Sequence, residues 1–470
     1  MSEIFKKKTF VIYIALVFCG ILTIGYQLHF ENFWLDEMNS FWVADPKLSL
    51  EEFFLRQKKS DYHNPFLFNL ILKEFLYFTK YEPSTARYLP FLFGSISLFF
   101  FGILSYQIKK DNSFLLSTFL ACVSIYIIKY SQEVRPYSLL LMFSTINIFL
   151  YTLILNIENY KKFNKYSLIF TFVIISVLNY STNPFSLIIF FSQIAHSIFL
   201  NIYFKKKNNL IFFSFLPIVL IYLLLNYNYI IYQISFSSYM LSSDISNVLD
   251  GLYFPRFFGS KIMGYIYLII LMFLIFYKRK SILCNKNYSL LITIFLFSYL
   301  IPFIYGIVKT PVLHDRYIIF VLIPIILLIS CLSNEIKSKK IKNFIIYFLI
   351  ISTLINHYLE IFKRKNSKPE FLKIIEHIRD KSLEKKIIVH ELFTNSNLVF
   401  NYLDNIDPKI KKNLNLLYYD KIIHKNLNSF WLLCYKPNKS VNCNIEEAEN
   451  WNLKKVETKY LVEAKLFNLK

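Results

Sequence analysis

The chain has 470 residues, of which 55% are hydrophobic and 18% are charged, and its net charge is +22. Soluble domains usually carry about 25% charged residues, whereas many apolar runs here reach the ~20 residues that a helix needs to span a bilayer. The composition therefore excludes a disordered, collagenous or soluble protein and indicates a multi-pass membrane protein. Its positive charge is then typical of cytoplasmic loops. Because no soluble part shows a clustered basic face, we expect no nucleic-acid partner.

Apolar runs predict about eleven membrane-spanning helices. The first run follows the basic residues Lys6–Lys8 and is too long for the apolar region of a signal peptide, so we expect it to remain attached. The predicted spans are residues 9–28, 85–107, 113–130, 135–156, 166–182, 184–203, 209–230, 261–277, 287–307, 317–334 and 341–362.

Basic residues gather in alternate connections between these spans. The clusters lie at residues 6–8, 109–110, 161–165, 205–207, 278–280 and 337–342. Cytoplasmic loops of membrane proteins are enriched in Lys and Arg. The alternation therefore predicts a cytoplasmic N-terminus, and the odd number of spans predicts a C-terminal tail on the outside.

Two long segments lie outside the predicted spans, and both are expected on the outer side. The outer loop, residues 29–84, has mixed apolar and charged faces that favour interfacial helices at 31–44, 48–58 and 63–80. The tail alternates helical and strand-like patterns, which is typical of a small α/β domain. We therefore expect a transmembrane domain at 1–362, loop included, and a tail domain at 363–470. The tail should contain helices at 370–380, 396–405 and 445–451 and strands at 386–390, 414–419, 430–435 and 461–469.

Two of the six cysteines, Cys434 and Cys443, lie in the tail on either side of a Pro-Asn-Lys-Ser turn. Outside the cytoplasm such a pair can form a disulfide that closes a short loop. Two free thiols, with Cys434 in the core of the domain, are the alternative. The sequence leaves both open.

An acidic pair, Asp36-Glu37, follows the first span in an aromatic setting. Ionisable groups near lipid are costly unless they are used. One carboxylate can serve as a general base, and two together can hold a divalent metal ion through oxygen. The alternative is that both are solvated at the start of a helix, where acids favour the helix dipole.

A second polar group, Asp61-Tyr62-His63-Asn64-Pro65, closes the outer loop. His63 has the chemistry to bind a metal ion or to donate to a phosphate. The alternative is structural, because Asn64 before Pro65 is a good start for a helix.

A third group lies in the outer turn between the third and fourth spans and contains Glu133, Arg135 and Tyr137. Pro136 suits the first turn of a helix and so gives the turn a structural explanation. Glu133 and Arg135 can simply pair with each other and extend to the interface. The functional alternative is that Arg135 and Tyr137 face a cavity and bind an anion.

A fourth group, His314-Asp315-Arg316-Tyr317, begins the tenth span. An arginine at a helix N-terminus has the wrong sign for the dipole. Next to His314, its guanidinium matches the oxygens of a phosphate. Anchoring of Arg316 and Tyr317 at the membrane interface is the alternative. All four groups are predicted on the same outer face, which strengthens the functional interpretation.

In their order, these motifs resemble the GT-C superfamily of membrane glycosyltransferases. Within it they look most like the bacterial protein-mannosyltransferase-like and aminoarabinose-transferase-like branch, glycosyltransferase family 39 and relatives. The resemblance covers roughly residues 1–360. Two positions depart from the family pattern: Asn64 replaces a proline, and Ser181-Thr182-Asn183 stands where the family has a histidine. The matching positions are Asp36-Glu37, His63-Asn64-Pro65-Phe66, Arg87-Tyr88-Leu89-Pro90, Glu133, Arg135 and Tyr137, and Arg316-Tyr317.

The resemblance implies a GT-C-like fold and an enzyme of the bacterial inner membrane. Such an enzyme moves a hexosyl or pentosyl group from a polyprenyl-phosphate donor to a hydroxyl of a lipid, glycan or protein acceptor outside the cytoplasm, among membrane lipids. Asp36 and Glu37 would be catalytic. A divalent metal held by Glu37 and His63 is left open. Substrate binding would fall to His63, Arg87, Glu133, Arg135, Tyr137, His314, Arg316 and Tyr317.

Two other classes of membrane protein compete with this interpretation. A transporter or flippase would also have many spans, but such proteins often show internal repeats and helices broken by Gly or Pro. No repeat stands out here, and only 8 residues are glycine. A polymerase of lipid-linked polysaccharide would share the topology and the outer arginines.

Overall fold

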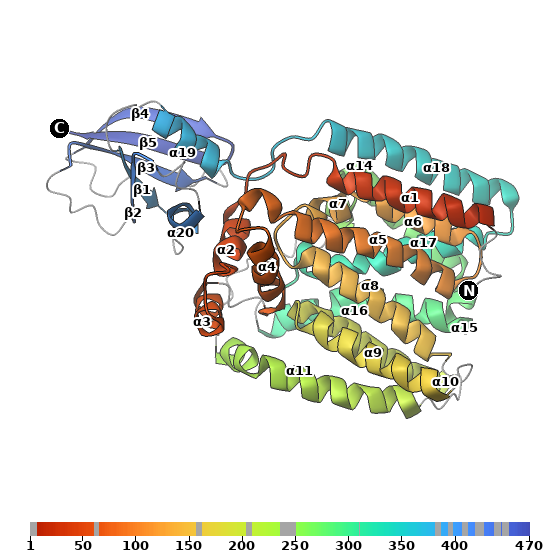
Figure 1. Ribbon diagram of the computed structural model, residues 1–470. Helices are drawn as coiled ribbons and strands as arrows, with labels where there is room; N and C mark the ends of the chain where they lie inside the picture. The colour runs from red at the N-terminus through yellow and green to blue at the C-terminus, as the bar shows by residue number, and fades with distance from the viewer. Residues whose placement is uncertain are drawn as a thin grey trace. The chain divides into compact units, whose positions relative to one another are not determined.

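The computed structural model describes residues 7–60, 65–156, 162–203, 209–235, 251–309, 311–380, 387–392, 398–406, 412–418, 427–436, 443 and 451–470. The chain divides into two compact units. The helical unit contains residues 1–26, 62–68 and 87–364, and the sheet unit contains residues 27–61, 69–86 and 365–470. Figure 1 shows the first as a bundle of helices and the second as a sheet with helices around it.

The helical unit consists of helices joined by short turns. Its elements are α1 Lys7–Gly25, α5 Tyr88–Ile108, α6 Ser113–Cys122, α7 Ile125–Ser131, α8 Tyr137–Ile154, α9 Lys162–Tyr180, η3 Pro184–Ser186, α10 Leu187–Tyr203, α11 Asn209–Ser235, η4 Gly251–Tyr253, α13 Phe254–Phe257, α14 Lys261–Tyr277, α15 Arg279–Cys284, α16 Lys286–Val308, η5 Asp315–Val321, α17 Leu322–Asn334, α18 Lys339–His357 and η6 Tyr358–Phe362.

Every apolar run predicted as a span contains a helix. Within the described residues, eight helices are long and apolar enough to cross a membrane, and α6 with α7 makes a ninth if this pair, bent by 54°, counts as one span. Helix α14 is apolar but shorter, at 17 residues. The positions of the runs are thus confirmed as helical, whereas the predicted number of about eleven spans is not confirmed.

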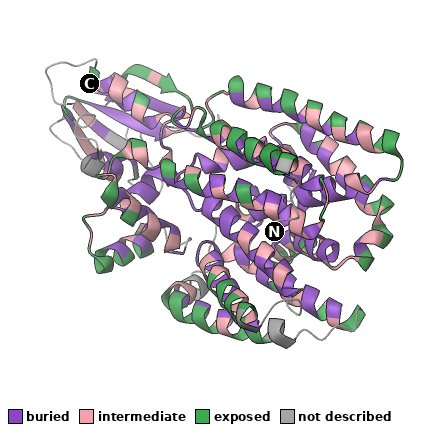
Figure 2. Cartoon of the chain, turned by 45° about the vertical axis from the view of Figure 1, so that its right-hand side comes forward, coloured by how far each residue is buried: buried purple, intermediate pink, exposed green. Residues whose placement is uncertain are grey.

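Burial sorts the helices into inner and outer ones. Helix α17 is buried along almost its whole length, as expected for a helix that is apolar on all sides. Helices α11 and α18 instead carry large exposed apolar side chains, including Leu224 and Phe344. Figure 2 shows the same contrast, with buried residues on the inner helices and exposed ones on the outer helices. Apolar outer faces are what a bilayer requires.

One end of the helical unit gathers lysines around Glu335. The Lys109 ammonium lies 3.5 Å from the Glu335 carboxylate, and Lys278 donates to the Glu335 backbone carbonyl at 2.7 Å. Tyr288 donates to Glu335 at 2.7 Å. We call this end, defined by Lys109, Lys278 and Glu335, the basic end. The structure therefore brings together connections whose basic residues the sequence placed on one side.

A chain of buried polar side chains runs between the inner helices. Gln193 of α10 donates to the Asn147 side chain of α8 at 2.6 Å, and Asn147 donates to Ser176 of α9 at 2.7 Å. The Tyr151 hydroxyl lies 3.1 Å from His196 Nδ1. On its other side, His196 Nε2 lies 3.1 Å from the Ser289 hydroxyl of α16. We call this set the polar chain. Hydrogen bonds of this kind hold helices together where no water is available.

The sheet unit combines the outer loop with the tail. Its elements are α2 Leu35–Val43, α3 Leu50–Ser60, most of α4 Leu67–Phe78, η1 Pro83–Thr85, α19 Phe371–Asp380, β1 Ile387–Leu392, α20 Leu398–Ile406, β2 Leu414–Tyr418, β3 Ser429–Tyr435, β4 Trp451–Lys459 and β5 Val462–Leu469. The strand order is β2-β1-β3-β5-β4. Strand β1 is parallel to β2 and β3, whereas β5 is antiparallel to β3 and β4.

Aromatic side chains join the loop to the tail inside the sheet unit. Tyr402 of α20 packs against Phe33 and Phe41, with ring centroids 6.0 and 5.9 Å away. Phe41 also stacks on Tyr81 at 4.5 Å. The sequence predicted a boundary after residue 362, and the helical unit ends nearby at Arg364. The compact division nevertheless groups most of the loop with the tail, so the domain assignment stays a prediction.

Most elements of the tail lie where the sequence predicted them, with one strand missed. Strand β4 was not predicted, and its residues after Trp451 are mostly exposed. An edge strand of this kind lacks the alternation of buried and exposed residues that reveals a strand. The predicted helix at 445–451 falls mainly outside the described residues, and its last residue, Trp451, begins β4.

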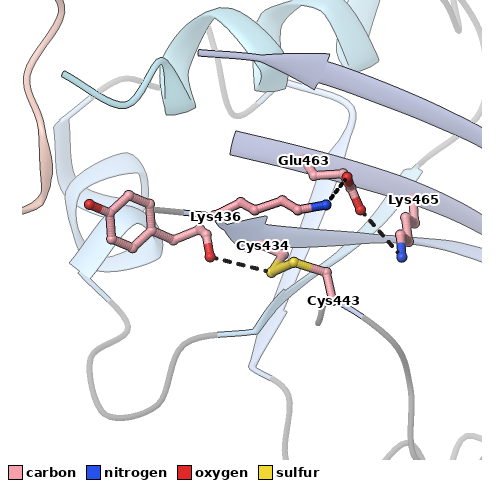
Figure 3. The surroundings of a disulfide bond; sticks show 6 residues. Cys434, Lys436, Cys443, Glu463 and Lys465 are labelled. Carbon is pink, nitrogen blue, oxygen red and sulfur yellow. Dashed lines mark hydrogen bonds and ion pairs between the residues drawn. A yellow bond between two sulfur atoms is a disulfide. The ribbon is translucent and has the colours of Figure 1, made fainter. Parts of the chain in front are cut away.

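A disulfide joins Cys434 at the end of β3 to Cys443. Figure 3 shows this bond beside a group of charged side chains on the neighbouring strands. There, Glu463 of β5 accepts from Lys436 at 2.9 Å and lies 3.3 Å from Lys465. Of the two alternatives left open by the sequence, the structure therefore contains the disulfide.

Candidate functional site

The turn before α8 is anchored from several sides. Gln132 donates from its side-chain amide to the carbonyls of Ile24 and Tyr26, at 2.7 and 2.9 Å, and its amide oxygen accepts from Arg364 at 2.6 Å. Close contact with α5 is allowed by Gly94, where an added Cβ would lie 2.0 Å from the Ser131 hydroxyl. The turn that carries Glu133 and Arg135 is therefore held rigidly by the helices around it.

Glu133, Arg135 and Tyr137 are all buried, with exposed fractions of 2%, 6% and 1%. Charged side chains extending freely to the membrane interface would be exposed, so that half of the alternative does not describe the turn, whereas a pairing of Glu133 with Arg135 is compatible with their burial. Tyr137 begins α8 and lies edge-on to Tyr130, with ring centroids 4.9 Å apart. A buried arginine needs anionic or polar partners, and the binding of an anion by this turn stays a prediction.

The third and fourth predicted groups meet in space. The Arg316 guanidinium lies 6.0 Å from the Tyr137 ring and 5.3 Å from the Tyr317 ring. The two tyrosine rings are 6.4 Å apart, and Phe185 of η3 stacks on Tyr317 at 4.9 Å. We call the set Glu133, Arg135, Tyr137, Arg316 and Tyr317 the arginine–tyrosine cluster. The cluster lies at the start of α8 and of η5. Helix α17 continues from η5, and Glu335 of the basic end follows the last residue of α17.

His314 and Arg256 both contact the carboxylate of Asp315, the residue just before Arg316. His314 Nδ1 contacts the Asp315 carboxylate, and the Arg256 guanidinium lies 3.5 Å from the same oxygen. The backbone N–H of Arg316 donates to the same ring nitrogen, His314 Nδ1, at 3.4 Å. His314 therefore contacts both Asp315 and the backbone of Arg316 in this structure, and Arg256 is a residue that the sequence did not single out.

A strained turn lies beside this acid. Gly251, Leu252 and Tyr253 all have left-handed backbone angles, with φ of 72°, 53° and 62°. Such a conformation is unfavourable for leucine and tyrosine and persists only where neighbours enforce it. Here Tyr299 donates to the Leu252 carbonyl at 2.9 Å and Tyr253 donates to the Leu313 carbonyl at 2.9 Å. Burial raises the pKa of Tyr253 to about 12, so its hydroxyl stays protonated.

Arg87 is the remaining predicted binding residue of the helical unit. It is buried, with 3% exposed, and directly precedes α5. Its backbone carbonyl accepts from Phe91 at 3.1 Å. The structure thus places Arg87 at the same end of the bundle as the start of α8, and its role in binding stays a prediction.

The acidic pair lies in the sheet unit, in the first turn of α2. This position agrees with the preference of acids for helix N-termini. The two carboxylates differ, however: Asp36 is half-buried, whereas Glu37 is fully buried. The Glu37 carboxylate accepts from the Lys368 ammonium at 2.8 Å. Simple solvation at a helix start therefore does not describe Glu37.

Asp36 faces a tyrosine from the tail. Burial raises the pKa of Tyr435 at the end of β3, and the negative charge of Asp36 raises it further. Tyr435 therefore stays protonated. The sequence did not single out this tyrosine, because its proximity to Asp36 depends on the folding of the tail beside the loop.

The residues around Glu37 do not fit a divalent metal ion. Lys368 places a positive charge 2.8 Å from the carboxylate oxygen on which an ion would bind. Among the described residues, no group of three or more His, Cys, Asp or Glu side chains is arranged to hold a metal. His63, the other predicted ligand, lies outside the described residues.

Helices of membrane length, eight or nine possible spans among the described residues, and a mixed sheet formed by the tail together define a membrane protein of many helices with a small sheet. No protein-family model and no curated protein sequence matches the chain significantly. The likeness is instead to solved structures, which share few residues with this chain.

Two structures of oligosaccharyltransferases from Archaeoglobus fulgidus show this likeness. One is a crystal structure with zinc and sulfate; its TM-score is 0.50 and its identity 11%, over 72% of this chain and 53% of that chain. The other is the archaeal oligosaccharyltransferase AglB with an inhibitory peptide and a dolichol-phosphate. Its TM-score is 0.54 and its identity 9%, over 84% of this chain and 63% of that chain. At such identities the likeness concerns the fold alone. This chain covers 53% of the first structure's chain and 63% of the second's, less than two thirds of either.

Proposed function

We propose that the protein is a glycosyltransferase that moves a sugar from a polyprenyl-phosphate carrier to an acceptor hydroxyl outside the cytoplasm. The observation that carries this proposal is the arginine–tyrosine cluster, in which Arg316 lies 6.0 Å from the Tyr137 ring and Arg135, two residues before Tyr137, is buried. The likeness of fold to two oligosaccharyltransferase structures supports it, as does the resemblance of the motifs to the GT-C superfamily and, within it, to glycosyltransferase family 39 and its relatives. A structural neighbour, AglB, is bound to a dolichol-phosphate, a ligand of the same chemical kind.

In this proposal the cluster binds the phosphate of the donor. A guanidinium presents two parallel N–H groups to phosphate oxygens, and a site in which Arg135 is buried strengthens that attraction. As the bond between sugar and phosphate breaks, negative charge grows on the leaving phosphate. Fixed positive groups stabilise that charge without needing to reorganise. Glu133, Tyr137, His314, Tyr317 and Arg87 complete the proposed binding residues.

Asp36 is the proposed general base. The acceptor oxygen attacks the anomeric carbon from the face opposite the phosphate, the carbon–oxygen bond to the phosphate breaks, and the acceptor's proton passes to Asp36. The products are the glycosylated acceptor with inverted configuration and polyprenyl phosphate. Glu37, paired with Lys368, would hold α2 and therefore Asp36 in position.

The proposed orientation has the basic end in the cytoplasm. Lysine-rich loops favour that side, and the Cys434–Cys443 disulfide suits an oxidising compartment for the tail. For a bacterium, the proposal is therefore a protein of the inner membrane with its N-terminus inside. An impermeant reagent should label a tag at Lys470 in intact cells lacking an outer-membrane barrier. Labelling from the cytoplasmic side alone would overturn the orientation.

The decisive experiment uses purified full-length protein in lipid vesicles with a radiolabelled polyprenyl-phosphate hexose or pentose and a mixture of envelope lipids, glycans and peptides. Transfer of label to one acceptor, with release of polyprenyl phosphate, supports the proposal and names the sugar and acceptor classes. Movement of intact donor across the membrane without cleavage would instead support a flippase. Growth of a long polysaccharide from the label would support a polymerase.

A further inference from the structure

A lysine of the tail, Lys368, lies against Glu37, one of the two predicted catalytic acids. The side chain of Lys368 is 9% exposed and that of Glu37 is fully buried, and their charged atoms are 2.8 Å apart. The ammonium also lies 6.0 Å from the centre of the Trp34 ring, within the range of a cation–π interaction. Trp34 and Glu37 belong to the same short stretch as Asp36, so one ammonium contacts both sides of the acidic motif.

The segment that carries Lys368 is itself fixed in place. The Glu31 carboxylate accepts from the Ser367 hydroxyl at 2.8 Å and from the Lys368 backbone N–H at 3.2 Å, and it also accepts from the Ser367 backbone. Pro369 follows and restricts the backbone of Lys368 to extended conformations. The ammonium is therefore delivered by an ordered backbone, unlike that of a surface lysine, which moves freely.

The charge already present beside Glu37 determines which cation can bind to its carboxylate. A buried carboxylate must be paired, and removing one partner of a buried pair leaves an uncompensated charge. A divalent ion at Glu37 would lie next to the ammonium, where like charges repel, unless it first displaced Lys368 from the carboxylate that it contacts at 2.8 Å. The arrangement is thus already neutralised from within the chain.

We propose that Lys368 is the resident cation of the Asp36–Glu37 pair and takes the place that a divalent metal ion would otherwise fill. It acts as a positioning residue: it neutralises Glu37 and fixes the first turn of α2, on which Asp36 lies. The ion-pair part of this proposal stands on the structure alone. Its catalytic consequence, sugar transfer without a divalent metal, rests on the proposed function.

A double-mutant cycle tests the pair without any assay of activity. In the full-length protein, Lys368→Met and Glu37→Gln should each lower the unfolding midpoint by about 5 °C or more, because each removes a charged partner 2.8 Å from a buried charge. The double variant should be more stable than the sum of the two effects predicts. Lys373→Met is the matched control, since Lys373 pairs with Glu370 in the same segment but is 45% exposed; its midpoint should barely change.

Manganese binding tests the replacement of a metal. Free Mn²⁺, counted by electron paramagnetic resonance, should show no Glu37-dependent site in the wild-type protein. Lys368→Met should gain such a site, and adding Glu37→Gln should remove it again. Lys368→Arg keeps the charge, should fold like the wild-type protein and should stay free of Mn²⁺, which preserves the test if Lys368→Met fails to fold.

Two results would overturn the proposal: wild-type Mn²⁺ binding that Glu37→Gln abolishes, or additive effects in the double-mutant cycle. If donor cleavage is detected, EDTA should leave the cleavage rate of the wild-type protein unchanged. A cleavage rate that falls with EDTA and is restored by Mn²⁺ would also overturn the proposal. Absence of cleavage with every donor would contradict the proposed function, whereas the cycle and the Mn²⁺ count would still decide the role of Lys368.

Discussion

The arginine–tyrosine cluster and the Glu37–Lys368 pair are built in opposite ways. In the cluster, each side chain lies at the start of a helix, and the helices that carry Tyr137 and Tyr317 bring the rings to 6.4 Å. In the pair, the partners are 331 residues apart in the chain, and only the folding of the tail beside the outer loop joins them. The cluster is thus a property of the bundle, whereas the acidic site depends on a second, separately folded part of the chain.

The largest expected effect concerns the acid. Asp36→Asn keeps the size and helix-start preference of the residue but cannot accept a proton, so turnover should fall about 10²-fold or more. Release of polyprenyl phosphate at saturating donor and acceptor measures this, and the unfolding midpoint should stay unchanged. Asp380→Asn, at an exposed acid of the same unit, is the control. Near-normal turnover would falsify the base assignment and direct attention to Glu37.

The cluster should respond in donor binding. Arg316→Ala should weaken binding of a polyprenyl-phosphate donor about 10-fold to 100-fold, the usual loss for a hydrogen bond to a charged group. Arg316→Lys should recover only part of it, because the bidentate fork is lost. Arg279→Ala, an exposed arginine over the Phe276 ring, is the control and should bind normally. Unchanged donor affinity in a folded Arg316→Ala protein would exclude Arg316 from the phosphate site.

Loss of the Cys434–Cys443 disulfide should lower the stability of the sheet unit and leave that of the helical unit unchanged. Replacing Cys434 and Cys443 together by serine should destabilise the sheet unit by about 2–3 kcal/mol, the loop-closure value for a short loop. Limited proteolysis should therefore cut the tail sooner while leaving the helical unit intact. Replacement of the free cysteine Cys284, which is exposed, serves as the control. If the wild-type protein and the double serine variant resisted the protease equally, the disulfide would add nothing to the stability of the sheet unit.

The smallest expected effect is on pH dependence. Burial raises the pKa of Glu463, but hydrogen bonds from Lys436 and Lys465 and their charges lower it by more, so it lies below its ordinary value of 4.5. A depressed carboxylate pKa contributes stability above the unfolded value and loses it as pH falls through the folded value. Stability of the sheet unit should therefore decline in acid below about pH 4.5, and Glu463→Gln should make this decline shallower. An identical acid profile in the variant would contradict this pairing.

The bundle was largely predictable because long apolar runs have few alternatives to a membrane helix. One break escaped prediction. Residues 113–130 form an unbroken apolar run, yet α6 ends at Cys122 and α7 begins at Ile125. The carbonyl of Val123 is instead paired with His357, at 3.1 Å from Nδ1. A partner so distant in the chain leaves no mark on the local pattern.

Contacts between residues distant in the chain also explain which residues of the candidate site the sequence did not reveal. Asp36, Arg135 and Arg316 were found because each belongs to a short motif that is out of place near lipid. Lys368 and Tyr435 belong to no motif, and their positions follow only from the packing of the tail. Glu31 looked like one more acid of an interfacial helix, whereas it binds the backbone of the segment before α19.

The polar chain has a consequence for how the protein is made. Asn147, Gln193 and His196 enter the membrane on α8 and α10, but Ser289, which closes the chain at His196, follows 93 residues later. At usual rates of synthesis this interval lasts about 5–20 s, during which His196 lies in the bilayer without its last hydrogen-bond partner. We therefore expect α8 and α10 to be retained by the insertion machinery until α16 arrives. Pulse-labelled chains stopped before Lys286 should crosslink to that machinery for longer, and be degraded sooner, than chains extended beyond Val308.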